Sequence, residues 1–199
     1  LVSLNTLPVW QDMDKSVRLA ASRIDFARLC AAGLWLEGLL IHRVTHQGFV
    51  AQAAAETRVV LQEVREEAGH GLMFLEMIDR AGMSGVRLLG PTWLLHAVAK
   101  RLDPEGAAFW AMVFIGESVT DSFALKALRA AETDGQDICP TAAAVMRLHH
   151  RDEARHMAAA KAMIDLKLAR TGPLRRLGFR IVVRMLIKRF LHATLYPTE

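Results

Sequence analysis

The residues best suited to chemistry lie in an alanine-rich, strongly helical stretch, where His149, Glu153 and His156 recur every three or four positions. On an α-helix these positions fall within about 60° of one another, so two imidazoles and one carboxylate share one face. An earlier stretch repeats the Glu-x-x-His spacing at Glu67 and His70. Imidazole and carboxylate ligands suit transition metals such as iron and manganese. The spacing therefore predicts a metal site.

Two further glutamates, Glu37 and Glu117, each stand alone in a long apolar run. A carboxylate on the buried side of a helix is costly unless it is paired or bound to metal. A Glu-x-x-His pair on each of two helices, plus one glutamate from each of two others, is the ligand set of di-iron carboxylate bundles. One such pair alone is common on a solvated helix face, but that alternative does not explain two pairs and two buried glutamates.

Each Glu-x-x-His is preceded by another acid, Glu66 in the first and Asp152 in the second. A ligating histidine usually donates its second ring N–H to a carboxylate, which fixes the orientation of the ring. We therefore assign Asp152 to hold His70 and Glu66 to hold His156, across the internal twofold relation of the two motifs. Asp121 is a second candidate for the same task.

His149 is either a packed or surface histidine or an additional metal ligand, and its phase with Glu153 and His156 favours the ligand. The remaining histidines lack such partners and we interpret them as ordinary residues. They are His42, His46, His96, His150 and His192.

Four residues near the lone glutamates are candidates for a substrate pocket: Cys30, Gly33, Trp110 and Phe114. Packing in the core is the alternative for Cys30, Trp110 and Phe114. A closely approaching helix is the alternative for Gly33, because a glycine thins the helix surface.

Helix-start and helix-stop signals divide the chain into long helices. No stretch alternates with period two for long enough to form a sheet, and no apolar run reaches the roughly 18 residues of a membrane span. We expect an all-α fold, a four-helix bundle with additional helices. The expected segments are an extended lead-in over 1–11, then helices over about 14–47, 50–81, 91–102, 103–132, 140–171 and 174–195.

Length and charge fit one domain over residues 1–199, with a metal-site core at about 14–171. Residues 167–199 carry eight Lys/Arg and one acidic residue, whereas residues 1–166 carry 17 Lys/Arg and 20 Asp/Glu.

The two cysteines form no CxxC pair and no secretion segment is evident, so we expect a cytoplasmic protein. The chain opens with Leu rather than Met, so a further N-terminal portion is also expected.

The basic segment 174–195 has the pattern of an amphipathic helix. Such a helix can lie on an anionic membrane or a nucleic acid. We favour a packing helix or a dimer element with a solvated basic face over membrane contact, and we expect no nucleic-acid partner.

The pattern Glu37, Glu67-x-x-His70, Glu117 and Glu153-x-Arg155-His156 resembles the ferritin-like di-iron oxygenase superfamily over about residues 30–160. The added His149 is similar to the third histidine ligand of the p-aminobenzoate N-oxygenase family. Members of that family oxidise arylamines in natural-product biosynthesis. The resemblance implies seven ligands, namely Glu37, Glu67, His70, Glu117, His149, Glu153 and His156.

The same resemblance implies two iron ions, with Mn/Fe as an alternative, and oxygen transfer from O₂ to an amine nitrogen through a peroxo intermediate. It further implies a small-molecule substrate and an external electron donor, and we expect a homodimer. The alternatives are a di-iron or Mn/Fe oxidase or oxygenase acting on another small or carrier-bound molecule, and a ferritin-like metal-handling protein. A purely structural basic bundle would leave the buried glutamates unexplained.

Overall fold

The computed structural model describes residues 8–46, 54–85, 93–103, 106–133, 138–169 and 171–195, and every regular element within these ranges is an α-helix. The all-α expectation is therefore confirmed. The helices are α1 (Pro8–Asp12), α2 (Lys15–His46), α3 (Ala54–Arg80), α4 (Trp93–Ala99), α5 (Ala107–Thr133), α6 (Pro140–Ala169) and α7 (Pro173–Leu195).

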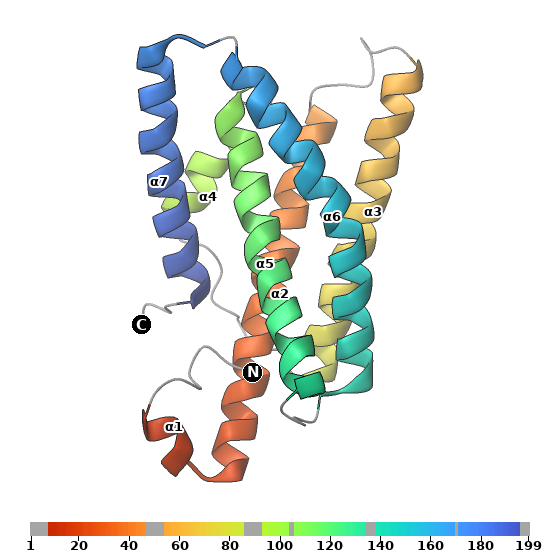
Figure 1. Cartoon of the computed structure of the whole chain (residues 1–199). Helices are drawn as coiled ribbons and strands as arrows, with labels where there is room; N and C mark the ends of the chain where they lie inside the picture. Colours follow the sequence, from red (N-terminus) through yellow and green to blue (C-terminus); the bar gives the residue numbers. More distant parts are fainter. Residues whose placement is uncertain are drawn as a thin grey trace.

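Four long helices form the bundle, and they are grouped as two antiparallel hairpins (Figure 1). Helix α2 packs chiefly against α3, and α5 packs chiefly against α6. The chain passes from the end of α3 to the start of α5 by a long crossover that contains α4 (Figure 1). Helix α7 then lies against α5 on the outside of the bundle.

The helix ends follow the signals in the sequence. Gly82 has φ of 75°, and the bonds from Gly82 N–H to the Asp79 carbonyl and from Met83 N–H to the Ile78 carbonyl close α3 in a Schellman motif. Pro140 and Pro173 open α6 and α7, where a missing N–H costs nothing.

Three expected boundaries need correction or fall outside the described residues. The extended lead-in is wrong over residues 8–11, because Pro8 opens α1 and Trp10 is buried on it. The expected start of α4 at Pro91 and the proline-containing start of α5 at 104–105 lie outside the described residues, where the sequence signals remain predictions.

Hydrophobic clusters lie on both sides of Glu37 along α2. One cluster joins α2, α5 and α7 through Leu40, Phe109 and Phe190, among others. The other joins α2, α3 and α6 through Cys30, Phe74 and Ala142, among others. The two clusters hold all four bundle helices at fixed spacing around the centre of the molecule.

Gly33 allows α2 and α3 to approach closely. A Cβ atom at Gly33 would lie 2.6 Å from Cε2 of Phe74, which is closer than carbon atoms pack. Gly38 has no atom within 4 Å of the corresponding position. The space beside Gly33 is therefore filled by a helix neighbour, the alternative given above for this glycine.

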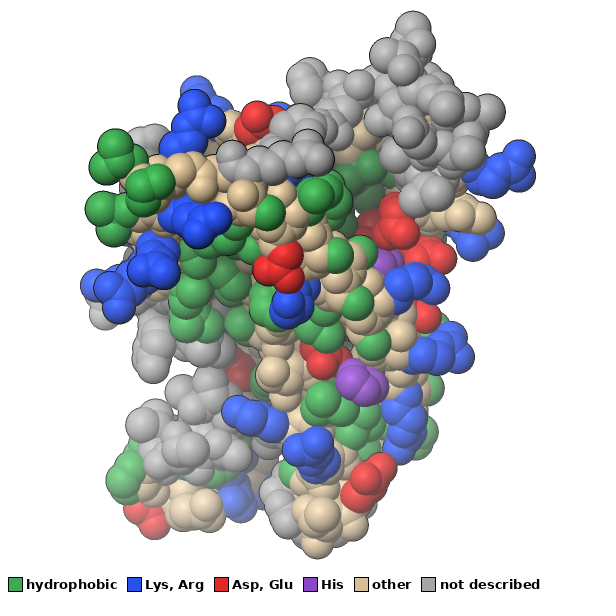
Figure 2. Space-filling model, turned by 45° about the horizontal axis from the view of Figure 1, so that its top comes forward, with side chains coloured by type: hydrophobic (Ala, Val, Ile, Leu, Met, Phe, Trp, Pro, Cys, Tyr) green, Lys and Arg blue, Asp and Glu red, His purple; other side chains and the backbone are tan. Residues whose placement is uncertain are grey.

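Helix α7 has two apolar faces. Leu186 and Phe190 are buried against the bundle. On the other face Leu174, Leu177 and Ile181 are exposed beside arginines, and Figure 2 shows hydrophobic and basic side chains together at this edge of the molecule. Helix α7 carries no acidic residue.

Among the described residues, α5 is the one helix long and apolar enough to cross a membrane by length and composition. Half of its apolar window is buried inside the bundle, and the helix carries the buried acids Glu117 and Asp121.

Candidate metal centre

The seven residues expected as ligands converge in the middle of the bundle. Their side chains come from four helices and each residue is at most 5% exposed. They are Glu37 on α2, Glu67 and His70 on α3, Glu117 on α5, and His149, Glu153 and His156 on α6.

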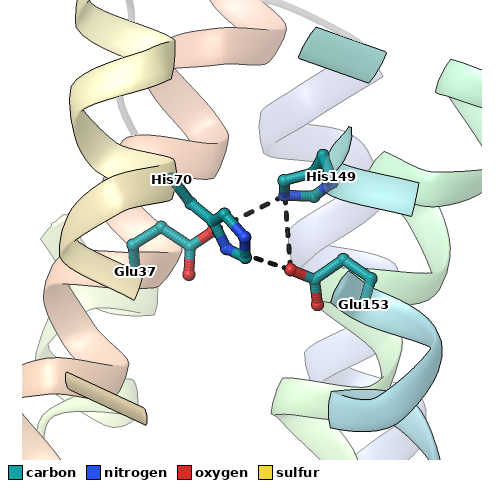
Figure 3. A group of neighbouring side chains, drawn as sticks. All are labelled: Glu37, His70, His149 and Glu153. Carbon is teal, nitrogen blue, oxygen red and sulfur yellow. Dashed lines mark ion pairs between the residues drawn. The ribbon is translucent and has the colours of Figure 1, made fainter. Parts of the chain in front are cut away.

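A first group of four faces one point between α2, α3 and α6 (Figure 3). Nδ1 of His70 lies 3.1 Å from Oε1 of Glu153 and 3.7 Å from Oε1 of Glu37. Nε2 of His149 lies 3.5 Å from Oε1 of Glu153 and 3.7 Å from Oε1 of Glu37. Two nitrogens and two carboxylates are thus close enough to bind one ion.

A second group adjoins the first and shares Glu153 and His70 with it. Nδ1 of His156 lies 3.2 Å from Oε1 of Glu67 and 3.3 Å from Oε2 of Glu153. The two carboxylate oxygens of Glu153 face different groups, so this side chain would help to hold an ion in either group.

Glu117 belongs to neither group of four, yet it is fully buried beside them. Its carboxyl is close enough to Glu37 and Glu153 for both to raise its pKa. Glu117 therefore supplies a further carboxylate on the α5 side of the centre.

Unsatisfied atoms show that these residues fit a metal. Ten buried side-chain N or O atoms of the described residues lack a hydrogen-bond partner, and eight of them belong to six of the seven residues. Buried polar atoms without partners are costly in an ordinary core. Oxygen and nitrogen donors without a thiolate suit iron or manganese better than a structural zinc.

The carboxyl groups repel one another. Burial, together with the neighbouring Glu67 and Glu153, raises the pKa of Glu37 well above its ordinary value. Burial also raises the pKa of Glu117, and the charges of Glu37 and Glu153 add to the effect. Burial acts in the same direction on Glu153, but the adjacent imidazoles of His156 and His70 outweigh it and lower the pKa of that carboxyl.

The three histidines differ in charge. Burial opposes protonation of His70, but the adjacent carboxylates of Glu153 and Glu67 raise its pKa to about 10. The pKa of His156 rises to about 9, because the adjacent carboxylates of Glu153 and Glu67 outweigh its burial. Burial lowers the pKa of His149, so this imidazole is neutral and its ring nitrogen is available to a metal.

The outer acids lie beside the histidines assigned to them. Nε2 of His70 is 3.8 Å from Oδ2 of Asp152, and Nε2 of His156 is 3.3 Å from Oε2 of Glu66. Arg155 bonds to Glu66.

The sequence interpretation missed Glu63, whose Oε2 atom is 3.2 Å from Nε2 of His156. Glu63 lies one helical turn before Glu67 and so shares its helix face, and this spacing could have indicated that Glu63 lies near the site.

Asp121, the second candidate for orienting a ligand, contacts a different histidine: its Oδ1 atom lies 2.5 Å from Nδ1 of His150, which is not one of the seven residues. Another of the ordinary histidines, His96, accepts a hydrogen bond from Nε1 of Trp35 at 2.9 Å and links α4 to α2.

Of the four candidates for a substrate pocket, one lines a cavity beside the metal centre and three do not. Cys30 lines a small cavity that reaches His149. Gly33 packs against Phe74, and Trp110 and Phe114 pack on the cluster under α7. These three do not line the described cavity beside His149, because their helix faces are already covered by neighbouring side chains.

A helical bundle whose core carries four glutamates and three histidines in this arrangement has the architecture of the ferritin-like di-iron carboxylate proteins. The chain belongs to the family described as p-aminobenzoate N-oxygenase AurF, a family of di-iron oxygenases whose sequence profile matches residues 1–199.

Similar proteins include the uncharacterized proteins Rv0885 of Mycobacterium tuberculosis and Mb0909 of Mycobacterium bovis. Each is 27% identical over 175 residues, which cover 87% of this chain and 50% of the relative. The chain thus spans about half the length of the curated relatives it matches. No solved structure matches it.

Proposed function

We propose that this protein is an O₂-dependent, non-haem di-iron oxygenase that oxidises the nitrogen of a small amine, using electrons from an external donor. The observation that carries the proposal is the convergence of seven buried ligand groups, with eight unsatisfied atoms, at one point of the bundle. Membership of the AurF family supports the di-iron chemistry.

The candidate ligand residues fall into two sets, one for each ion. Glu37, His70, His149 and Glu153 would hold one ion, and Glu67, Glu153 and His156 the other, with Glu117 completing the α5 side. When bound, two iron ions supply the binding and reduction of O₂. The protein contributes burial, which excludes water and strengthens every charge interaction at the centre.

His149 supports nitrogen oxidation in particular. A Glu-x-x-His pair on each of two helices plus two single glutamates gives six ligands, and His149 adds a third imidazole. With its neutral ring and its position between Glu37 and Glu153, it would donate a nitrogen to one ion. This added nitrogen is the feature shared with the N-oxygenase family.

Metal analysis tests the di-iron part. We expect two iron ions per chain after anaerobic loading with Fe(II), and at most one in Glu117→Ala. Glu132→Ala is the matched control, because Glu132 is an exposed glutamate of the same helix that pairs only with Arg147 at 3.8 Å among the described residues. One tightly held zinc per chain would overturn the proposal.

Product analysis tests the nitrogen part. The reduced, iron-loaded protein should incorporate ¹⁸O from ¹⁸O₂ into the nitrogen of an arylamine such as 4-aminobenzoate or of another amine, as read by mass spectrometry. Oxygen incorporated at carbon only would assign the site to a general di-iron oxygenase. Iron oxidation without any organic product would assign it to metal handling.

A further inference from the structure

Two adjoining cavities lead from the surface to the metal centre. The outer cavity has a volume of about 460 Å³ and is lined by the exposed residues Arg23, Arg80 and Cys139. The inner cavity is small, about 30 Å³, and reaches Cys30 and His149. The cavities therefore lie in line between the end of the bundle and the first group of metal ligands.

Four side chains line both cavities and form the constriction between them: Phe26, Met77, Phe123 and Met146. Two of the four are methionines, whose unbranched side chains adapt their shape at low cost. The inner cavity is almost wholly apolar, and the Phe74 ring lies 5.2 Å from that of His149 at its inner end. An apolar chain can therefore pass this constriction, whereas a charged group would lose its hydration there.

The helices set the length of the route. Arg80 lies ten residues after His70 on α3, and Cys139 lies ten residues before His149 at the start of α6. At about 1.5 Å per residue, the mouth is roughly 15 Å from the metal ligands along the bundle.

The charged side chains that line the mouth are basic. Among the described residues that line the outer cavity, Arg23 and Arg80 are basic and none is acidic. Arg80 bonds to the exposed Glu76 at 2.7 Å, and Arg23 has no ion pair with a described residue. Hydrogen bonding from the backbone of Ala142 lowers the pKa of Cys139, and the charge of Arg80 acts in the same direction.

We propose that these cavities bind an elongated amphiphile with a carboxylate at one end, held by Arg23 and Arg80, and an apolar body that reaches His149. The oxidation of an amine at the inner end of that body rests on the proposed function, whereas the binding of the amphiphile does not. In 4-aminobenzoate a single benzene ring separates the amine from the carboxylate. That molecule is too short to touch the arginines and the metal centre together.

Binding of dodecanoate to the purified protein, measured by calorimetry, is the first test. We expect saturable binding that weakens about tenfold or more in the double variant Arg23→Glu, Arg80→Glu, because a charge-assisted bond is lost and repulsion replaces it. Arg58→Glu, at an exposed arginine of the same helix as Arg80, is the matched control and should bind normally. Since all three arginines are exposed, the variants should fold, as thermal unfolding would verify.

Cys139 provides a second, independent readout of the mouth. Its exposed thiol should react readily with N-ethylmaleimide, whereas burial raises the pKa of Cys30 to about 12 and leaves that thiol unreactive. Dodecanoate should slow the alkylation of Cys139, and dodecylamine, which has the opposite charge, should not. Equal protection by both compounds, or unchanged dodecanoate affinity in the double variant, would overturn the proposal.

Iron content measured on the same preparations separates the two proposals. Dodecanoate binding by a protein that never takes up two ions would overturn the proposed function alone. Two bound ions without dodecanoate binding would overturn the amphiphile site alone.

Discussion

Oε2 of Glu63 lies 3.2 Å from Nε2 of His156, on the side of the imidazole that faces away from the metal centre. The other ring nitrogen of His156 faces Glu67 and Glu153 inside the centre. Glu66 approaches the same outer nitrogen at 3.3 Å. One ligand is thus oriented by two carboxylates from α3, one turn apart along that helix.

Replacing Glu63 should weaken the hold on His156. In Glu63→Gln we expect Fe(II) affinity to fall, and in Glu63→Gln, Glu66→Gln we expect a larger fall of roughly 10–100-fold, because the ring loses both anionic partners. Anaerobic Fe(II) titration measures the effect. Glu76→Gln, at an exposed glutamate of the same helix, is the control. Normal affinity in the double variant would show that the ring is fixed by the centre itself.

Asp152→Asn tests the corresponding partner of His70. The substitution keeps the size of the side chain but removes the charge 3.8 Å from Nε2 of His70. Metal affinity should fall by roughly 10–100-fold in a competition titration. Asp165→Asn removes an exposed carboxylate of the same helix, paired with Lys161, and should have no effect. If Asp152→Asn and Asp165→Asn have the same metal affinity, Asp152 does not hold His70.

His149→Ala should separate metal binding from oxygen chemistry. Six ligand side chains remain, so the variant should still hold two ions, but oxidation of an arylamine should be lost first. Stopped-flow spectroscopy after O₂ addition and product analysis measure this. His150→Ala is the neighbouring control, since His150 bonds to Asp121 outside the centre. If His149→Ala oxidises the arylamine as the wild type does, His149 serves only in packing.

Metal binding should release protons and strengthen as pH rises. In the metal-free protein His70 and His156, with pKa values of about 10 and 9, are protonated at neutral pH, and both must be neutral to bind metal. Glu37 and Glu117, whose pKa values are raised, add to the effect. Calorimetry of metal binding in buffers of different ionisation enthalpy counts the protons.

The same shifts give the metal-free fold its own pH dependence. A histidine whose pKa is raised on folding stabilises the fold fully below its unfolded value of 6.5, and this contribution is lost as pH rises through 9–10. Urea unfolding of the metal-free protein should therefore show falling stability over that range. Metal binding without proton release, together with stability that does not change with pH, would contradict both expectations.

Gly33→Ala and Gly38→Ala form a matched pair on α2. Gly33→Ala should destabilise the fold by about 1–3 kcal/mol, because the new methyl group would overlap the Phe74 ring. Gly38→Ala adds a methyl group in open space and should stabilise the helix by about 0.5–1 kcal/mol. Urea unfolding of both variants measures the difference. A Gly33→Ala variant at least as stable as Gly38→Ala would contradict the close packing at Gly33.

The convergence of the candidate ligands could be predicted from the sequence, because helical periodicity fixes which side chains share a face. His149, Glu153 and His156 are neighbours on any α-helix, and a buried carboxylate such as Glu37 is rare without a partner. The resulting expectation of an all-α bundle is confirmed.

Helical periodicity does not predict contacts between different helices, since these depend on crossing angles and on which faces meet. Asp121 and His150 are 29 residues apart, and nothing in their spacing pairs them. Glu63 looked like any acid on a solvated helix face. The cavity at Arg23 and Arg80 is formed where the start of α2, the end of α3 and the start of α6 come together, and the spacing of residues in the sequence does not predict that meeting.

The division of the bundle into two hairpins affects how the protein is assembled. The α2–α3 hairpin carries Glu37, Glu67 and His70, and the α5–α6 hairpin carries the other four ligand residues. Each hairpin can form early from contacts close in sequence, whereas joining the two brings mutually repelling carboxylates together. Bound ions would then act as a cross-link between separately folded halves. Loading and release of metal would follow the parting of the hairpins, and the slowest-exchanging amide protons of the loaded protein would be those of the residues along this junction.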